Sequence, residues 1–393
     1  MKITGIICEY NPLHRGHKKQ INTVRAIRGE DSGVVCLMSG NYVQRGAPAL
    51  IEKAHRAKAA VLCGADLVLE LPVTYALSSA EGFAAGGVRL LSGFCDALCF
   101  GAENADKGLL LSTASALLQE DFPDALRLQL DCGLSFPAAR EAALASMGAD
   151  TALLKSPNNI LAVEYCKAIL SQKSPMEPMP IFRGGSYHDT APEADNPSAT
   201  AVRQLLLNGG HWQSFIPEEA VTPFTKVTLH SLAAGERAVL AKLRSMTDPE
   251  FEALPYGAEG LWRKFMHAVR KEATLEAILT SVKSKRYTRS RLDRMLMCAF
   301  LGITQQDLQT PAPYARVLAF NDRGRQILKT ARATGNYPNI GQRLDNPYQA
   351  LEDRCGSLYG LFAQGIVESP GVEADLRVFH FSGNDSIGKE TPL

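Results

Sequence analysis

The stretch Ile3-Thr-Gly-Ile-Ile-Cys-Glu-Tyr-Asn-Pro-Leu-His-Arg-Gly-His17 decides the fold of this chain. Its opening run, residues 3–8, is almost entirely apolar, which is typical of a strand buried on both faces of a sheet. The polar loop that follows leads into a helical pattern at 17–28. A strand that passes through a loop into a helix is the opening unit of an α/β fold.

The same alternation of strand and helix continues through the first two hundred residues. Four more strands are predicted, at 33–38, 66–71, 97–100 and 180–183. Helical patterns accompany them at 52–63, 80–91, 108–118, 119–150 and 158–170, and a further helix opens at Ser198. Near-continuous apolar strands separated by helices predict a parallel sheet that is covered on both faces.

The length of 393 residues suits two or three domains of roughly 150 residues each. After the proline-bracketed stretch 216–223 strand signals become few, and residues 224–300 are helical in pattern. We therefore predict an α/β fold, with a Rossmann-like parallel sheet at 1–215 and a mainly α-helical domain at 216–393.

Composition excludes several classes of protein. Hydrophobic residues make up 46% and charged residues 21%, which excludes a disordered or collagen-like chain. Lys and Arg number 42 against 41 Asp and Glu, so any nucleic-acid contact has to come from a local patch. The nine cysteines form no CxxC pair, no metal site is predicted, and no apolar run reaches the ~20 residues of a membrane span. These features predict a cytoplasmic protein without a membrane anchor.

Polar loops follow four of the predicted strands, at 9–17, 39–48, 70–72 and 101–104. In a parallel sheet the carboxyl ends of the strands meet at one edge, where α/β proteins bind their ligands. We therefore expect these loops to converge on one site.

The first of these loops carries His14-Arg-Gly-His17, two imidazoles at the predicted start of a helix. A helix N-terminus offers unpaired N–H groups and a positive dipole end to phosphate, and Gly16 lets the backbone approach closely. Imidazoles can donate hydrogen bonds to phosphate oxygens as charge builds up during displacement at phosphorus. Two unrelated surface histidines, or a metal-binding pair, are the alternatives that the spacing leaves open.

The string from Gly5 to His17 resembles the signature of the HIGH-type nucleotidyltransferase superfamily, and in its full form that of the bacterial tRNA(Met) cytidine acetate ligases. Further segments resemble this family in the same order along the chain, at 38–49, 66–72, 100–103, 155–161, 187–189 and 198–200. Two positions depart from it: Arg15 replaces a small or amide residue, and Cys8 replaces an aliphatic one.

The resemblance implies an ATP site in which His14 and His17 are the catalytic residues. The implied ATP contacts are Ile7, Cys8, Glu9, Tyr10, Asn11, Pro12, Leu13, His14, Arg15, Gly16, His17, Lys18, Lys19, Gln20, Gly101, one or both of Asn158 and Asn159, and Arg183. The chemistry agrees, since a glycine admits the adenosine, an amide suits ribose or base, and a guanidinium suits phosphate. A simple turn at Gly101 and a surface ion pair at Arg183 are the alternatives.

For five polar residues, Glu9 among them, the sequence leaves two or more roles open. Arg45 steers the substrate carboxylate, contacts RNA or is solvated. Glu9 and Glu70 orient a metal-bound water or an arginine, or are paired structurally. Ser198 and Thr200 contact the triphosphate from a second helix N-terminus, or cap that helix.

A basic block lies between Trp262 and Phe300, where ten Lys or Arg residues face three acids. Such a block can neutralise RNA phosphates, and Tyr287 is a candidate for stacking on an unpaired base. A solvated helix face is the alternative. The predicted RNA contacts are Lys283, Lys285, Arg286, Arg289, Arg291 and Arg294.

The activity that the resemblance implies is that of an ATP-dependent, RNA-modifying ligase. Acetate attacks the α-phosphate of ATP, expected with Mg²⁺, to give acetyl-adenylate, and the wobble cytidine of elongator tRNA(Met) takes the acetyl group. No covalent nucleophile is expected, because the chain has no GxSxG motif. Two other readings remain open: a nucleotidyltransferase that makes a small activated metabolite, and a non-catalytic RNA-binding protein.

Overall fold

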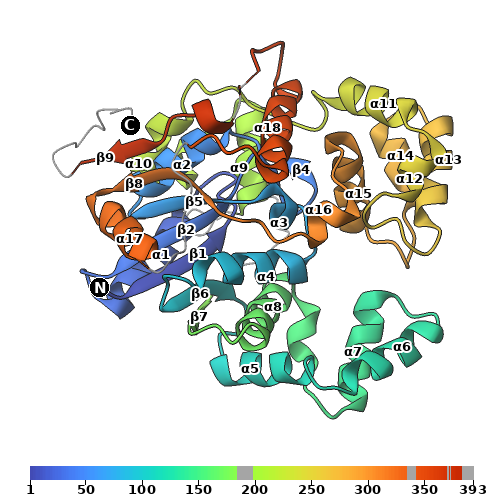
Figure 1. The fold of residues 1–393 in the computed structure, drawn as a ribbon, viewed down its shortest axis with the longest axis horizontal. Coiled ribbons are helices and arrows are strands. Elements are labelled where there is room, and N and C mark those ends of the chain that lie inside the picture. Colours follow the sequence, from blue (N-terminus) through green and yellow to red (C-terminus); the bar gives the residue numbers. More distant parts are fainter. Residues whose placement is uncertain (184–197, 334–341, 370, 372, 383–393) are drawn as a thin grey trace.

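The computed structural model describes residues 1–183, 198–333, 342–369, 371 and 373–382 (Figure 1). The predicted polar loop 184–197, which includes the family segment 187–189, lies outside the described residues.

A seven-stranded sheet forms the centre of the molecule, in the order β7-β6-β1-β2-β5-β8-β9 (Figure 1). The first five strands in this order run parallel, as predicted, and each lies within a few residues of its predicted position. Strand β8 is antiparallel to β5, and β9 is parallel to β8. The strands are β1 (Ile3–Cys8), β2 (Gly33–Ser39), β5 (Leu67–Leu71), β6 (Ala97–Ala102), β7 (Glu177–Phe182), β8 (Arg316–Asn321) and β9 (Phe379–Phe381).

Helices cover both faces of the sheet, which confirms the predicted layered arrangement (Figure 1). Helix α1 shows why: Ile21 and Val24, one turn apart, are buried against the sheet, while Arg15, Lys19 and Asn22 are exposed. One face is covered by α1 (Arg15–Arg28), α2 (Lys53–Leu62), α9 (Ala199–Leu207) and α10 (Glu218–Phe224). The other is covered by α4 (Ala80–Leu91), α5 (Lys107–Ala116), α8 (Pro157–Ser171) and α17 (Asp322–Ala333).

Helices α11 to α15, residues 236–301, form a separate group beside the sheet that we call the helical lobe (Figure 1). They share an apolar core of their own, to which helix α18 and the buried Tyr42 also contribute. The members of this group and α18 are α11 (Glu236–Ser245), α12 (Asp248–Glu252), α13 (Leu261–Lys271), α14 (Leu275–Val282), α15 (Arg289–Leu301) and α18 (Pro347–Tyr359).

The remaining strands and α-helices lie outside these layers. They are the hairpin strands β3 (Tyr42–Val43) and β4 (Ala47–Pro48), and helices α3 (Val73–Ala76), α6 (Phe122–Asp131), α7 (Phe136–Ser146) and α16 (Gln305–Gln309). Among the described residues, no helix has the length and apolar character needed to cross a membrane.

The sequence analysis assigned the sheet to residues 1–215, and the structure adds two strands from the C-terminal part of the chain. Strand β8 pairs with β5, and β9 extends it. A short apolar run such as 316–321 does not distinguish a strand from a buried helical segment, so the sequence pattern did not reveal this return to the sheet. The division at residue 215 remains a prediction.

Candidate active site

The loops that follow β1, β2, β5 and β6 lie at one edge of the sheet, as the sequence analysis expected. These four strands are parallel, and β1 lies between β2 and β6. The loop after β1 and the N-terminus of α1 therefore stand at the centre of this edge.

His14 and His17 form one stacked unit at the start of α1. His14 is the N-cap residue, and its Nδ1 accepts a hydrogen bond from the backbone N–H of Gly16 at 3.2 Å. In return, Nδ1 of His17 accepts one from the backbone N–H of His14 at 3.2 Å. The ring centroids are 3.7 Å apart and the rings are inclined by 27°. The two imidazoles replace the usual Ser and Glu of a capping box.

This geometry fixes which ring nitrogen carries the hydrogen. Because both Nδ1 atoms accept, each neutral ring carries its proton on Nε2, which is the donor that remains for a ligand. Burial, with Arg183 and Arg203 nearby, lowers the pKa of His14 to about 3. Burial and the neighbouring His14 hold the pKa of His17 well below its ordinary value. Nε2 of His14 is buried and has no hydrogen-bond partner among the described residues.

Arginine side chains hold the loop between β1 and α1 from two sides. Arg203 of α9 donates to the carbonyl of Asn11 at 2.8 Å and to Oγ1 of Thr200 at 2.9 Å. Asn11 also accepts a hydrogen bond from the backbone N–H of Leu50 at 2.8 Å. Ser198 caps α9 by accepting from the backbone N–H of Ala201 at 3.1 Å.

Arg56 of α2 is fully buried and is a residue that the sequence analysis missed. Its guanidinium donates to the carbonyl of Glu9 at 2.6 Å and to that of Ser39 at 3.0 Å, and it also contacts the carbonyl of Gly40. It thereby ties the end of β1 to the end of β2. An arginine in an alanine-rich helix gives no sign in the sequence that its side chain points inward.

Among the predicted ATP contacts at 7–20, some side chains are buried in the apolar core and others are exposed at the surface. Ile7, Tyr10 and Leu13 pack into the apolar clusters, so any contact that they make with ATP has to come from their backbone. Arg15 and Lys19 are exposed. The departure at Arg15 therefore places a cation at the surface without altering the histidine pair.

The remaining predicted contacts meet at the ends of β6 and β7. A Cβ added to Gly101 would lie 3.5 Å from Cδ of Arg183. Nη1 of Arg183 contacts Oδ1 of Asn158 at 3.5 Å, and Nδ2 of Asn158 donates to Oε1 of Glu103 at 2.7 Å. Gly101, Arg183 and Asn158 are therefore neighbours in the structure.

The two adjacent asparagines have different surroundings. Asn159 is buried, and its Oδ1 accepts from the backbone N–H of Asn104 at 2.9 Å, which fixes the loop after β6. Asn158 is partly exposed and lies beside Arg183. Asn158 is therefore the better placed of the two for a ligand contact. Glu103 holds both by accepting from the Asn158 side chain and from the Asn159 backbone at 2.8 Å.

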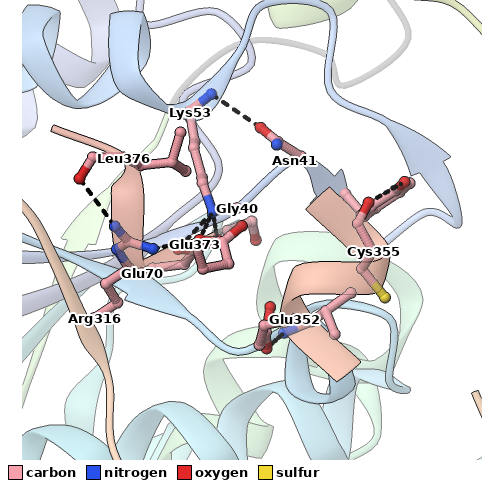
Figure 2. A network of polar contacts seen from close by, with 12 residues as sticks. Gly40, Asn41, Lys53, Glu70, Arg316, Glu352, Cys355, Glu373 and Leu376 are labelled. Atoms are coloured by element: carbon pink, nitrogen blue, oxygen red, sulfur yellow. Dashed lines mark hydrogen bonds and ion pairs between the residues drawn. The ribbon is translucent and has the colours of Figure 1, made fainter. Parts of the chain in front are cut away.

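Glu70, at the end of β5, belongs to a buried cluster of charges (Figure 2). Nζ of Lys53 donates to Glu70 at 2.8 Å and also contacts Glu373. Arg316 of β8 donates to Oε2 of Glu373 at 2.8 Å. Glu352 of α18 accepts from the backbone N–H of Val73, and burial together with Glu70 and Glu373 raises the pKa of Glu352 to about 8. Structural pairing of Glu70, one of the predicted readings, is what this cluster shows.

The six predicted RNA contacts have different surroundings. Lys283, Lys285 and Arg286 are exposed, and Arg286 pairs with Glu259 at 3.1 Å. Arg289 pairs with Glu276 and Asp293, and Arg291 donates to the carbonyl of Tyr256 at 3.0 Å and lies over the ring of Tyr287.

Arg294 is largely buried and donates to the carbonyl of Gln44 at 3.4 Å. Its guanidinium thus contacts another segment of the chain, and its role as an RNA contact stays a prediction. The sequence could not separate it from its neighbours, because helical position alone does not tell which basic side chains find a partner in another segment.

Comparisons with known proteins identify the family. The profile of the family described as HIGH Nucleotidyl Transferase matches residues 1–369. A tRNA(Met) cytidine acetate ligase of Clostridium novyi is 39% identical, over 86% of this chain and 89% of that protein. One of Alkaliphilus metalliredigens is 38% identical, over 96% and 98% of the two chains.

Two solved structures have the same fold as this chain. The crystal structure of Thermotoga maritima TmcAL without ligand superimposes with a TM-score of 0.89 and 28% identity, covering 97% of this chain and 100% of that one. The same protein bound with alpha-thio ATP gives a TM-score of 0.87 with 27% identity and the same coverage. The chain therefore belongs to the HIGH nucleotidyl transferase family and, within it, to the tRNA(Met) cytidine acetate ligases.

Proposed function

We propose that this chain is an ATP-dependent ligase that activates acetate and transfers the acetyl group to a cytidine of tRNA(Met). The observation that carries the proposal is the stacked pair of His14 and His17 at the N-terminus of α1, with Nε2 donors left for a ligand. Relatives that share most of the chain are tRNA(Met) cytidine acetate ligases, and a similar solved structure binds an ATP analogue.

In the first step an acetate oxygen attacks the α-phosphorus of ATP, the bond to the β-phosphate oxygen breaks, and pyrophosphate leaves. The chain contributes positioning and charge stabilisation. The histidines donate as neutral imidazoles, because their pKa values lie well below neutrality. Arg183, beside Asn158 at the end of β7, supplies a fixed positive charge for the phosphates. Mg²⁺ is expected on the triphosphate, where it would neutralise phosphate charge.

In the second step the exocyclic amine of the cytidine attacks the carbonyl carbon of acetyl-adenylate. The new C–N bond replaces the bond to AMP, which leaves with the phosphate oxygen, and the amine loses a proton. The acceptor we propose is the wobble cytidine of elongator tRNA(Met). Lys283, Lys285 and Arg286 are the proposed RNA contacts in the helical lobe, since all three are exposed and positive. Because tRNA is the substrate, we place the protein in the cytoplasm.

Mass analysis of nucleosides from tRNA incubated with the protein, ATP and acetate tests the proposal. We expect N4-acetylcytidine with the wild-type chain and nearly none with His17→Ala, because the loss of a transition-state donor costs about 10²–10³ in rate. His211→Ala, which changes an exposed histidine outside the His14–His17 pair, is the matched control. Acetylcytidine formed equally by His17→Ala, or no product from the wild type, would contradict the proposal.

A further inference from the structure

The β3–β4 hairpin, residues 42–48, is bound on one side to the proposed ATP site. The backbone N–H of Gln44 donates to Oε1 of Glu9 at 3.0 Å, and Glu9 directly follows β1. The far end of the hairpin is tied back as well, because the backbone N–H of Ala49 donates to the carbonyl of Asn41 at 2.9 Å. The segment that begins at Leu50 is hydrogen-bonded to Asn11.

The other side of the hairpin is packed on the helical lobe. Arg294 of α15 donates to the carbonyl of Gln44, and its guanidinium lies 5.3 Å from the ring centre of Tyr256. Gly46 is buried with φ of +78°, and a Cβ there would overlap the backbone of Asp293 and Arg294. Only glycine meets both requirements, the positive φ and the close approach of two backbones.

Gln44 therefore links the loop after β1 to helix α15 of the helical lobe. Its N–H is held by Glu9, which begins the loop after β1, and its carbonyl is held by Arg294 in the middle of α15. Arg45, the exposed residue at the hairpin turn, directly follows Gln44. Lys283, Lys285 and Arg286 directly precede α15 in the chain.

We propose that the β3–β4 hairpin positions the helical lobe relative to the ATP site. Acetyl transfer to RNA then depends on the close packing of Gly46 against the backbone of α15, whereas acetate activation does not. The inference rests on the proposed function. In the proposed function His14, His17 and Arg183 serve activation, and all three lie outside the hairpin. Transfer needs the RNA held by the lobe to bring one amine to the acetyl-adenylate, and a misplacement of about 1 Å can cost 10²-fold in rate. Gly46 and Arg294 are positioning residues in this scheme.

The test is Gly46→Ala with the two half-reactions measured separately. Acetate-dependent exchange of pyrophosphate into ATP reports activation, and acetylcytidine formation reports transfer. We expect exchange within about threefold of wild type and a loss of transfer of at least about tenfold. Gly29→Ala is the matched control, because Gly29 has a similarly positive φ of 96° but no atom within 4 Å of an added Cβ. It should leave both half-reactions unchanged.

A second variant keeps the proposal testable if Gly46→Ala does not fold. Arg294→Met retains the packing of the side-chain stem and removes the hydrogen bond to Gln44. It should produce the same split between exchange and transfer. Equal loss of both half-reactions in a folded variant, or full transfer in either one, would overturn the inference. Absence of exchange in the wild-type chain would instead contradict the proposed function.

Discussion

Replacement of Glu352 by Gln is expected to stabilise the fold, and by more as the pH rises. Burial and then the carboxylates of Glu70 and Glu373 raise the pKa of Glu352 from 4.5 to about 8. Lys53 and Arg316 supply the positive charges of the same cluster. Three ionised carboxylates therefore outnumber two cations, and the cluster is balanced only while Glu352 keeps its proton.

The direction in which the free energy of unfolding changes with pH follows from the protons that the folded and unfolded chains bind. Between pH 4.5 and about 8 the folded chain holds a proton that the unfolded chain has lost, so the free energy of unfolding falls over this range and is constant above it. The full interval corresponds to about 5 kcal/mol at 1.36 kcal/mol per pKa unit. Solvent access to the half-buried side chain reduces this, and we expect about 2–3 kcal/mol at pH 8.5 and about 1 kcal/mol at pH 6.

Glutamine does not titrate and can keep the hydrogen bond that Glu352 accepts from the backbone N–H of Val73 at 2.9 Å. Thermal unfolding of both chains at pH 6, 7, 8 and 9 measures the effect. For a chain of this length 1 kcal/mol corresponds to about 1 °C in Tm, so the difference should grow from about 1 °C to about 3 °C. Glu368→Gln, at an exposed position, is the control and should show no trend with pH. A difference that is constant across this range, or a variant less stable than wild type, would refute the reasoning.

Two more predictions concern ligand binding. Asn158→Ala should raise KM for ATP about tenfold and leave stability unchanged. Asn159→Ala should lower the free energy of unfolding by about 1–2 kcal/mol, because it frees the loop after β6. Thermal unfolding and ATP kinetics, measured on both variants, separate the two effects. Equal effects of both changes on KM would contradict this division. The double change Lys283→Ala and Lys285→Ala should weaken tRNA binding and reduce its dependence on log[salt] by about 1.4, while ATP binding persists. Lys329→Ala on α17 is the control, and an unchanged salt slope in the double variant would exclude these lysines from the RNA interface.

Much of the sheet and of the helices that cover it was predictable because their signals are local. The five parallel strands are short apolar runs, and their helices carry the spacing that buries one face, as Ile21 and Val24 do in α1. The position of His14 and His17 after β1 also follows from the chain order alone. Strands β8 and β9 were not recognised, since their place in the sheet depends on a partner far away in the sequence.

The sequence by itself determined the parallel sheet, the edge at which its loops meet and the imidazole pair at the start of α1. These depend on residues within a turn or two of one another, or on the rule that parallel strands end together. Only the tertiary structure decided that Lys53 meets Glu373, 320 positions along the chain, that Arg294 serves the hairpin, and that Asn158 rather than Asn159 stands beside Arg183. A charged or amide side chain has the same appearance in the sequence whether it faces water or a partner, because its partner is chosen by packing between distant segments.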